Sequence, residues 1–328
     1  MVSFIIPVYN SENTIQRCID SILSQTCKGY EIIAVNDCSQ DESKLRLEEY
    51  GEKIVLLENS KNKGVSATRN HALKEAHGDW ITFVDSDDYV VPYFVESIEM
   101  AGRSDSDLLI WKTQTCYSGS VDWNEHKTRN MAVSYYPHDS FGLGGVQVTP
   151  YLHGKVFRRS VIEKAGISFN EKMSMGEDSL FIKQYLSAMK QGFVQSEDVA
   201  YFYTRDNENS LSRKYYDNLE YCYSEIYDAL KEMEKRYPNF QVNSGKKKMI
   251  AAMVIQNLYA DSCNLSRRQR IATISRYMSD LETKQQMTEY VLSRMDLIRK
   301  VLFQINNPWL LDAVFSMGKK LSKKIKKS

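Results

Sequence analysis

Two acidic clusters in the sequence carry residue types that metal-assisted and acid–base chemistry require. In the first, ITFVDSDD, Asp85 and Asp87 lie two residues apart directly after an apolar run. Carboxylates at the end of a buried strand are costly unless they are compensated, and a divalent cation compensates them. Their hard oxygen ligands suit Mg²⁺ or Mn²⁺, which keep coordination positions for water and phosphate. An acidic turn without a metal is the alternative for this segment taken alone.

The second cluster is MSMGEDSLF, in which Glu177 and Asp178 come where a helix is predicted to begin. The helix N-terminus favours an ionised carboxylate at Asp178. Adjacent helical side chains point about 100° apart, so only one of the two acids can face a reaction centre. The alternative for this motif alone is that both acids simply favour the start of a helix.

Together the two clusters match one reaction, the displacement of a nucleoside diphosphate from a sugar's anomeric carbon. A metal on Asp87, with Asp85 behind it, would neutralise the leaving diphosphate. The incoming hydroxyl needs a base, and a positioned carboxylate contributes about 10²- to 10⁴-fold in rate. We expect Asp178 to be that base.

Elements that place these acids are visible in the first 90 residues. Apolar, β-branched runs alternate there with segments of helical period, which predicts a doubly wound, mostly parallel sheet flanked by helices. The predicted strands are Val2–Val8, Glu31–Val35, Ile54–Leu57 and Trp80–Val84. Ligands of such sheets bind beyond the carboxyl ends of the strands. The residues found there are Pro7, Val8, Tyr9, Asn10, Asn36, Asp37, Asp85, Ser86, Asp87 and Asp88.

The rest of the chain divides into an irregular part and a helical part. A strand is predicted at Leu108–Lys112 and another at Val199–Tyr203, with an irregular, acceptor-side region at Thr113–Val148. Helical period then dominates, in the segments Leu219–Tyr237, Lys246–Cys263, Arg267–Leu281 and Gln286–Ile305. We therefore expect an α/β catalytic domain at 1–210 and an all-helical C-terminal domain at 211–328.

Composition narrows the class of protein. The 328 residues carry a formal net charge of +1, which favours neither nucleic acid nor another polyanion as a partner. The six cysteines form no CxxC pair, which is typical of reduced thiols in a cytoplasm. No segment reaches the roughly 18 consecutive apolar residues of a spanning helix. A cytoplasmic protein is predicted, and its oligomeric state stays open.

The last 21 positions, 308–328, form a distinct amphipathic segment. Asn307 and Pro308 predict a helix start. An apolar stripe of Leu310, Val314, Met317, Leu321 and Ile325 then runs against six lysines in the last ten residues. This pattern fits a helix on an anionic membrane surface, on the inner face of the cell membrane. The alternative is a tail whose apolar face packs on the preceding helices.

Several ordered motifs make the chain resemble glycosyltransferase family 2, the inverting enzymes of the GT-A fold. They span roughly residues 1 to 212: VSFIIPVYN (Val2–Asn10), VNDCSQDES (Val35–Ser43), NKGVSATRNHAL (Asn62–Leu73), GDWITFVDSDD (Gly78–Asp88), HGKVFRRS (His153–Ser160), GEDSLF (Gly176–Phe181) and YTRDNENSLS (Tyr203–Ser212). The resemblance implies a metal-dependent hexosyl- or N-acetylhexosaminyl-transferase of bacterial surface-polysaccharide synthesis. It also implies a UDP-sugar donor and a glycan or lipid-linked acceptor.

The resemblance also implies roles for individual residues. Tyr9 and Asp37 would hold uracil and ribose, beside Pro7, and Arg69 would contact the nucleotide. The DxD element would comprise Asp85, Ser86 and Asp87, with Mn²⁺ or Mg²⁺ on Asp87 and Asp85. Asp178 would be the base, Glu177 would place acceptor or donor sugar, and Arg205 and Ser210 would close a loop over the diphosphate.

One position departs from the family pattern, and two other classes of protein would show different residues. Cys38 stands where the family commonly has glycine, and it cannot relax into a positive φ as glycine can. His153 could be a third metal ligand, but a lone histidine beside Gly154 is more often a packing or acceptor-side residue, which is the interpretation adopted. Lys155 is interpreted as a phosphate contact. A nucleotidyltransferase would need a Gly-rich phosphate loop near the first strand, which is missing. A glycan-binding scaffold would not need Asp85, Asp87 and Asp178 together.

Overall fold

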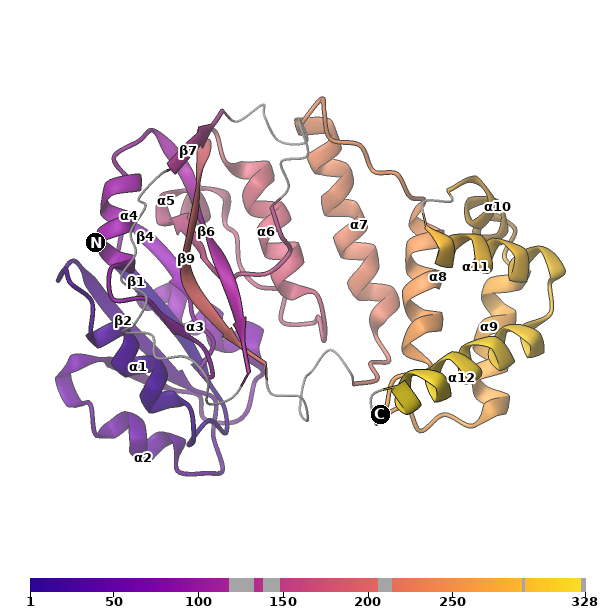
Figure 1. Cartoon of the computed structure of the whole chain (residues 1–328), viewed down its shortest axis with the longest axis horizontal. Helices are drawn as coiled ribbons and strands as arrows, with labels where there is room; N and C mark the ends of the chain where they lie inside the picture. Colours follow the sequence, from indigo (N-terminus) through magenta and orange to yellow (C-terminus); the bar gives the residue numbers. More distant parts are fainter. Residues whose placement is uncertain (118–132, 138–147, 206–213, 291–292, 326–328) are drawn as a thin grey trace. The chain divides into compact units, whose positions relative to one another are not determined.

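The computed structural model describes residues 1–117, 133–137, 148–205, 214–290 and 293–325, and these residues form two compact units. The first unit holds the described residues of Met1–Lys172, Glu177–Asp206 and Met233–Phe240, and the second holds the rest. Figure 1 shows a sheet with its helices in the first unit and helices alone in most of the second. The predicted domain boundary at residue 210 lies outside the described residues.

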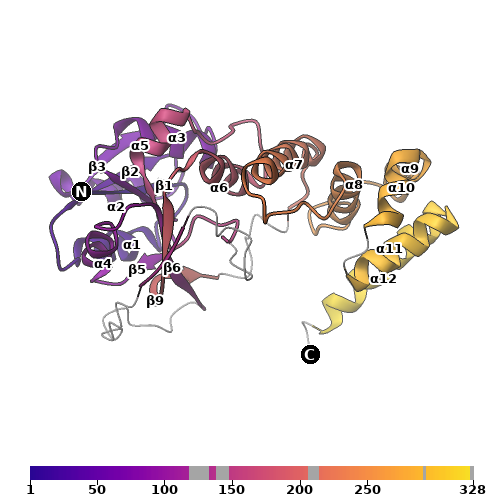
Figure 2. The same cartoon turned by 90° about the horizontal axis from the view of Figure 1, so that it is seen from above.

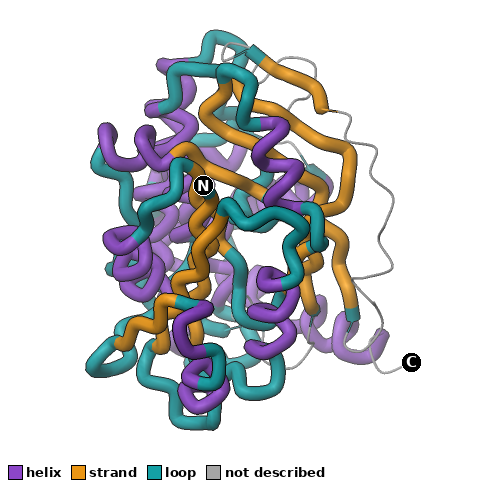
Figure 3. Tube along the Cα trace, turned by 90° about the vertical axis from the view of Figure 1, so that its left-hand side faces the viewer, coloured by secondary structure: helices purple, strands orange, loops and turns teal. Residues whose placement is uncertain are grey.

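A mixed sheet forms the centre of the first unit. Its strands run in the order β3-β2-β1-β4-β8-β6-β9-β5, and β7 pairs with β9. Neighbours from β3 to β4 are parallel, as predicted, whereas β8 is antiparallel to both β4 and β6. Figure 3 shows the strands in orange, and their bounds are β1 (Val2–Val8), β2 (Tyr30–Asn36), β3 (Val55–Glu58), β4 (Trp80–Phe83), β5 (Tyr89–Val90), β6 (Ser106–Cys116), β7 (Val133–Tyr136), β8 (Lys155–Arg158) and β9 (Gly192–Thr204).

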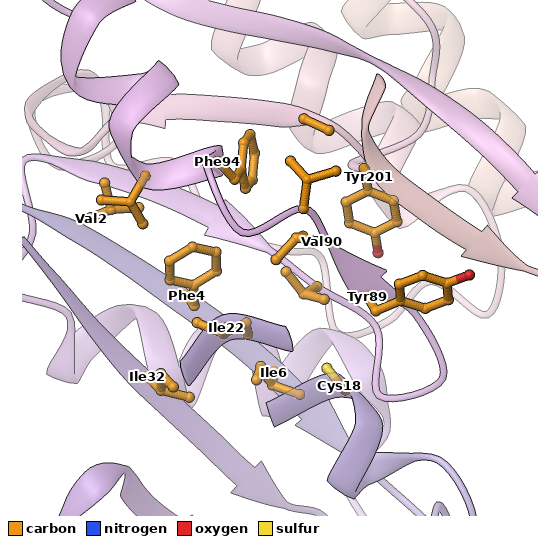
Figure 4. Close-up of a cluster of buried hydrophobic side chains, with 14 of the residues drawn as sticks. Val2, Phe4, Ile6, Cys18, Ile22, Ile32, Tyr89, Val90, Phe94 and Tyr201 are labelled. Carbon is orange, nitrogen blue, oxygen red and sulfur yellow. The ribbon is translucent and has the colours of Figure 1, made fainter. Parts of the chain in front are cut away.

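Helices cover both faces of this sheet (Figure 2). Alternate residues of β1 serve the two faces, since Phe4 and Ile6 join one buried cluster and Ile5 joins the other. On the Phe4 face, Figure 4 shows Phe4 beside Phe94, whose ring centroid lies 6.2 Å away. The helices of that face are α1 (Ile15–Leu23), α2 (Ser43–Glu48) and α4 (Phe94–Ala101), and those of the opposite face are α3 (Val65–Glu75), α5 (Arg159–Ala165) and α6 (Glu177–Ala188). A short 3₁₀ turn, η1 (Gly51–Lys53), precedes β3.

The region predicted to be irregular contains more strand than expected. β6 continues to Cys116, and β7 pairs antiparallel with β9 through Tyr135 and Val194. The expectation for Thr113–Val148 is therefore wrong for these two segments, because pairing with the long β9 supplies their backbone hydrogen bonds. Residues 118–132 and 138–147 lie outside the described residues.

The second unit is helical, with a core that includes Ala251, Ile274, Phe303 and Leu311. Its helices are the part of α7 (Leu219–Arg236) up to Glu232, and α8 (Lys246–Asn257), α9 (Arg267–Ser279), α10 (Leu281–Glu289), α11 (Arg294–Ile305) and α12 (Pro308–Ile325). Among the described residues, none of the helices has the length and apolar character needed to cross a bilayer.

One helix prediction in this unit is wrong and one is confirmed. The segment Gln286–Ile305 is not a single helix, since α10 ends at Glu289 and α11 begins at Arg294. The Ser293 side chain accepts a hydrogen bond from the Asp296 N–H, which makes it an N-cap that starts a new helix. The predicted start of α12 is confirmed, because Asn307 Oδ1 accepts from the Trp309 and Leu310 N–H groups.

Candidate active site

The carboxyl edge of the sheet gathers predicted site residues of the first unit. Tyr9 follows β1, Asp37 follows β2 and Asp85 follows β4. Because β8 runs antiparallel to β4, the segment that enters β8 reaches the same edge. His153 comes from that segment. The topology thus brings residues from four separate parts of the chain to one edge.

A buried arginine joins the two acidic clusters. Arg69, on α3, has only 4% of its side chain exposed. Its Nη2 donates to Asp85 Oδ1 at 2.9 Å, and its Nη1 donates to Asp178 Oδ1 at 2.7 Å. Glu177 Oε1 lies 3.7 Å from Nη1. The structure therefore places Asp85 and Asp178, one acid from each cluster, on one guanidinium group.

Asp178 lies in an environment that changes its acidity. Burial raises the pKa of the Asp178 carboxyl to about 7, although Arg69 and Lys155 pull it down. Glu177 and Asp85 add to the rise because like charges disfavour ionisation. A carboxyl with a pKa near neutral pH is well matched to accepting a proton from a hydroxyl group. Only a minority of its side-chain surface, 21%, is exposed.

Two residues to which the sequence assigned no role hold the turn from Asp85 to Asp88 in place: Asp88, already expected at this edge, and Arg17. Asp88 is fully buried and accepts hydrogen bonds from Tyr201 Oη at 2.6 Å and Thr204 N at 2.7 Å. Arg17 Nη2 donates to the Asp87 carbonyl at 2.6 Å and also reaches Thr204 Oγ1. These bonds tie the turn to the end of β9. The third acid of DSDD is a sequence signal for Asp88, whereas nothing local marks Arg17.

The described residues contain one group that fits a divalent cation, formed by Asp85, Asp88 and His153. His153 Nε2 lies 3.9 Å from Asp85 Oδ2, and the other oxygen of Asp85 faces Arg69. Two ligands of one Mg²⁺ lie at most about 4.2 Å apart, so this pair fits. Burial lowers the pKa of His153, which keeps the imidazole neutral and able to bind metal. Asp88 already uses both oxygens for the turn.

The end of the edge that is predicted to bind the nucleotide differs in one respect from expectation. Cys38 has φ 59°, the left-handed conformation that the sequence argument expected only glycine to adopt there. This conformation costs a non-glycine residue roughly 1–2 kcal/mol. Neighbouring hydrogen bonds compensate, since Asn36 Oδ1 accepts from Ser39 N and Asn10 Oδ1 accepts from Gln40 N. The expectation that cysteine would avoid this conformation is therefore wrong.

Asp37 and Tyr9 are placed at this end in different ways. Asp37 is 3% exposed, and its carboxylate accepts from Asn59 Nδ2, Lys63 N and Gly64 N at 2.8 to 2.9 Å. It therefore fixes the segment that enters α3. Tyr9 is 48% exposed, and its side chain is accessible to a ligand.

The remaining predicted residues have the following positions. Pro7 is part of β1 and pairs with Val35, and the Ser86 hydroxyl lies 2.6 Å from Ser11 Oγ. Arg205 follows β9, where its N–H donates to the Cys116 carbonyl. Ser210 lies outside the described residues. Lys155 was predicted as a phosphate contact, but its Nζ donates to Thr149 Oγ1 and to the Tyr151 carbonyl.

The strand order and the acidic carboxyl edge together define an α/β protein of the GT-A class. Residues 3–166 match the family described as Glycosyl transferase family 2. The chain belongs to that family.

Individual relatives agree with this assignment. The chain is 33% identical over 216 residues to a poly(ribitol-phosphate) beta-glucosyltransferase of Bacillus spizizenii, covering 63% of this chain and 33% of that protein. It is 31% identical over 223 residues to the uncharacterized glycosyltransferase EpsJ of Bacillus subtilis, covering 65% and 63%. The chain thus spans less than two thirds of the length of either relative.

Solved structures support the fold. A crystal structure of S. aureus TarS 1-349 in complex with UDP-GlcNAc matches with a TM-score of 0.64 at 20% identity. The match covers 97% of this chain and 91% of that chain. The predicted fold class, a GT-A sheet followed by a helical region, is confirmed.

Proposed function

We propose that this protein is an inverting glycosyltransferase of cell-surface polysaccharide synthesis. It would move a hexosyl or N-acetylhexosaminyl group from a UDP-sugar to a hydroxyl of a glycan or lipid-linked oligosaccharide. The observation that carries the proposal is the Arg69 bridge between Asp85 and Asp178. That bridge joins a carboxylate of the donor side to a carboxylate suited to proton transfer. Relatives named as poly(ribitol-phosphate) glycosyltransferases support the choice of pathway.

The proposed chemistry is a single displacement. The acceptor oxygen forms a bond to the anomeric carbon while the bond from that carbon to the diphosphate oxygen breaks. The hydroxyl proton passes to Asp178, and UDP leaves with the bonding electron pair. Arg69 keeps Asp178 oriented and partly offsets the effect of burial on its pKa. Glu177, 3.7 Å from the same guanidinium, would help to place a sugar.

The other residues at the carboxyl edge of the sheet would bind the donor. The exposed ring of Tyr9 would contact the uracil, and Asp37 with Pro7 would shape the ribose site. Ser86 belongs to the DxD turn, and Arg205 and Ser210 would close over the diphosphate. Asp85 and His153 would hold Mn²⁺ or Mg²⁺, and Asp87, two residues after Asp85, is proposed as a further ligand. The cation, when bound, supplies positive charge to the leaving diphosphate.

An assay of UDP release tests the activity and its metal dependence together. With a panel of UDP-sugars and cell-wall glycan fractions, we expect release in Mn²⁺ or Mg²⁺ and a loss of about 10²-fold or more in EDTA. Restoring the cation should restore the rate. Undiminished release in excess EDTA would contradict the metal assignment, and no release from any sugar nucleotide would contradict the function.

We also propose a peripheral contact with the inner face of the cell membrane. Among the described residues, α11 and α12 carry nine exposed apolar side chains, which we call the α11–α12 surface: Met295, Leu297, Ile298, Val301, Ile305, Trp309, Leu310, Val314 and Met317. Figure 2 shows both helices on one side of their unit. The opposite face of α12 is buried through Leu311 and Asp312.

Charge favours a lipid surface as the occupant. Three members of the predicted tail stripe, Leu310, Val314 and Met317, are exposed and do not belong to the buried cluster of the second unit. The last ten residues hold six lysines, and four of these belong to α12. Each lysine near an anionic bilayer contributes about 1 kcal/mol. An amphipathic helix of this kind would lie in the plane of the membrane interface.

Vesicle sedimentation tests this contact. The full chain should bind vesicles of phosphatidylglycerol and phosphatidylcholine more tightly than pure phosphatidylcholine, and salt should weaken that binding. Leu297→Ser with Met317→Ser should reduce binding by about tenfold or more, because two exposed apolar side chains are lost. Leu281→Ser is the control, since Leu281 is 81% exposed on α10, outside the surface. The proposal would be refuted if the double variant bound vesicles as tightly as the wild type. It would also be refuted if the two substitutions only disrupted a dimer and left vesicle binding unchanged.

A further inference from the structure

Four aromatic rings form a stack at the carboxyl edge, and the proposed chemistry uses only one of them, His153. Tyr151 lies parallel to His153, with centroids 5.6 Å apart and an interplanar angle of 5°. His153 in turn stacks on Tyr203 at 4.8 Å and on Tyr201 at 5.4 Å. Tyr201 is fully buried, whereas Tyr151 is 57% exposed. The stack therefore leads from the core to a solvent-facing ring.

The segment that carries Tyr151 is fixed from inside the protein. Lys155 has 1% of its surface exposed, and its Nζ donates to Thr149 Oγ1 at 2.7 Å and to the Tyr151 carbonyl at 2.5 Å. Gly154 has φ 64°, and a Cβ there would lie 2.6 Å from the Trp111 carbonyl oxygen. These contacts restrict the backbone, so the exposed ring is preorganised and loses little freedom when a ligand binds.

The position of the stack in the sheet indicates which of the two substrates, donor or acceptor, it faces. Tyr9 and Asp37 follow β1 and β2, on one side of β4, and these strands carry the proposed nucleotide end. The Tyr151 segment enters β8, on the other side of β4, and Tyr203 lies near the end of β9, farther along the sheet. His153 lies 3.9 Å from Asp85, so the stack borders the site of sugar transfer. A group bound on Tyr151 would therefore lie on the opposite side of β4 from Tyr9 and Asp37.

We propose that the exposed face of Tyr151 binds a pyranose ring of the acceptor glycan. The axial C–H groups of a pyranose form an apolar face that packs on an aromatic ring, while its hydroxyls remain in water. A tyrosine supplies this contact area at low conformational cost, and its phenol tolerates solvent. The inference rests on the proposed function, and it names the side of the site on which the acceptor sugar lies.

Matched tyrosine variants test this role with two independent readouts. The probes are the methyl β-pyranosides of glucose, galactose and N-acetylglucosamine, of which the one that most stimulates UDP release is used for kinetics. Tyr151→Ala should raise KM for this acceptor by about tenfold, while kcat and KM for the UDP-sugar stay within about twofold. Tyr151→Phe should retain the wild-type KM. Tyr135→Ala is the control, because Tyr135 is 49% exposed on β7 at the other end of β9.

Saturation-transfer NMR of the same pyranosides measures binding without turnover. Weaker pyranoside binding by Tyr151→Ala than by Tyr135→Ala supports the role of Tyr151. This holds even if no UDP-sugar is turned over. Absence of turnover would refute only the proposed function. If Tyr151→Ala raises KM for the UDP-sugar instead of KM for the acceptor, the proposed acceptor contact is overturned, since the Tyr151 ring would then bind the donor. Unchanged acceptor KM and unchanged NMR binding would also overturn it.

Discussion

Asp178→Asn is expected to lower kcat by about 10²- to 10⁴-fold while KM for the UDP-sugar changes little. The amide keeps the shape of the side chain and its contact with Arg69, but it cannot accept the proton of the incoming hydroxyl. Initial rates of UDP release at saturating donor and acceptor measure the effect. Glu163→Gln on α5, an exposed acid paired with Arg159, is the matched control and should keep full activity.

The same carboxyl predicts the pH dependence. Because burial raises the pKa of Asp178 to about 7, the base is protonated in more of the molecules as pH falls below that value. The rate should therefore rise with pH across the region below 7 and level off above it. A cation bound at Asp85 would move this rise to lower pH, since added positive charge favours the carboxylate. A rise that persists unchanged in Asp178→Asn would show that another group is the base.

The second large effect is on stability. Arg69→Met should lower the free energy of unfolding by about 3 kcal/mol, because it removes the cation between Asp85 and Asp178 and leaves charged groups uncompensated. Methionine occupies similar space, so loss of charge rather than a cavity dominates. Urea unfolding at neutral pH, followed by circular dichroism, measures the change. Arg46→Met is a suitable control, since Arg46 also pairs with carboxylates but on an exposed surface.

Arg69 variants also separate charge from geometry. Arg69→Lys keeps a cation but cannot donate to Asp85 and Asp178 in the fixed fork of a guanidinium, so stability should recover only in part. In Arg69→Met the pKa of Asp178 should rise further, because Arg69 is the group that lowers it most. The activity rise should then move to higher pH. Wild-type stability in Arg69→Met would mean that the two carboxylates do not depend on this arginine.

Local patterns predicted most of the elements that build the site. Buried strands such as Val2–Val8 were identified by their apolar runs, and the helix at Glu177 by its acids and the apolar period that follows. The GT-A fold and the family followed from the order of the motifs. Segments whose pairing partners are distant were predicted poorly, as β7 and the ends of β9 show. Hydrogen bonds between segments far apart leave no local periodicity.

The residue types and their order along the chain were therefore enough to predict the fold class and the acidic carboxyl edge. They also indicated Asp85 as a metal-site acid and Asp178 as the base. Tertiary structure alone decided what each acid contacts. It placed the Arg69 guanidinium between Asp85 and Asp178. It also brought Asp88 and Arg17 into the hydrogen bonds that hold the turn, and stacked Tyr151 on His153. The physical reason is that side-chain contacts and burial arise only when separate segments meet, and these contacts and burial set the pKa of Asp178.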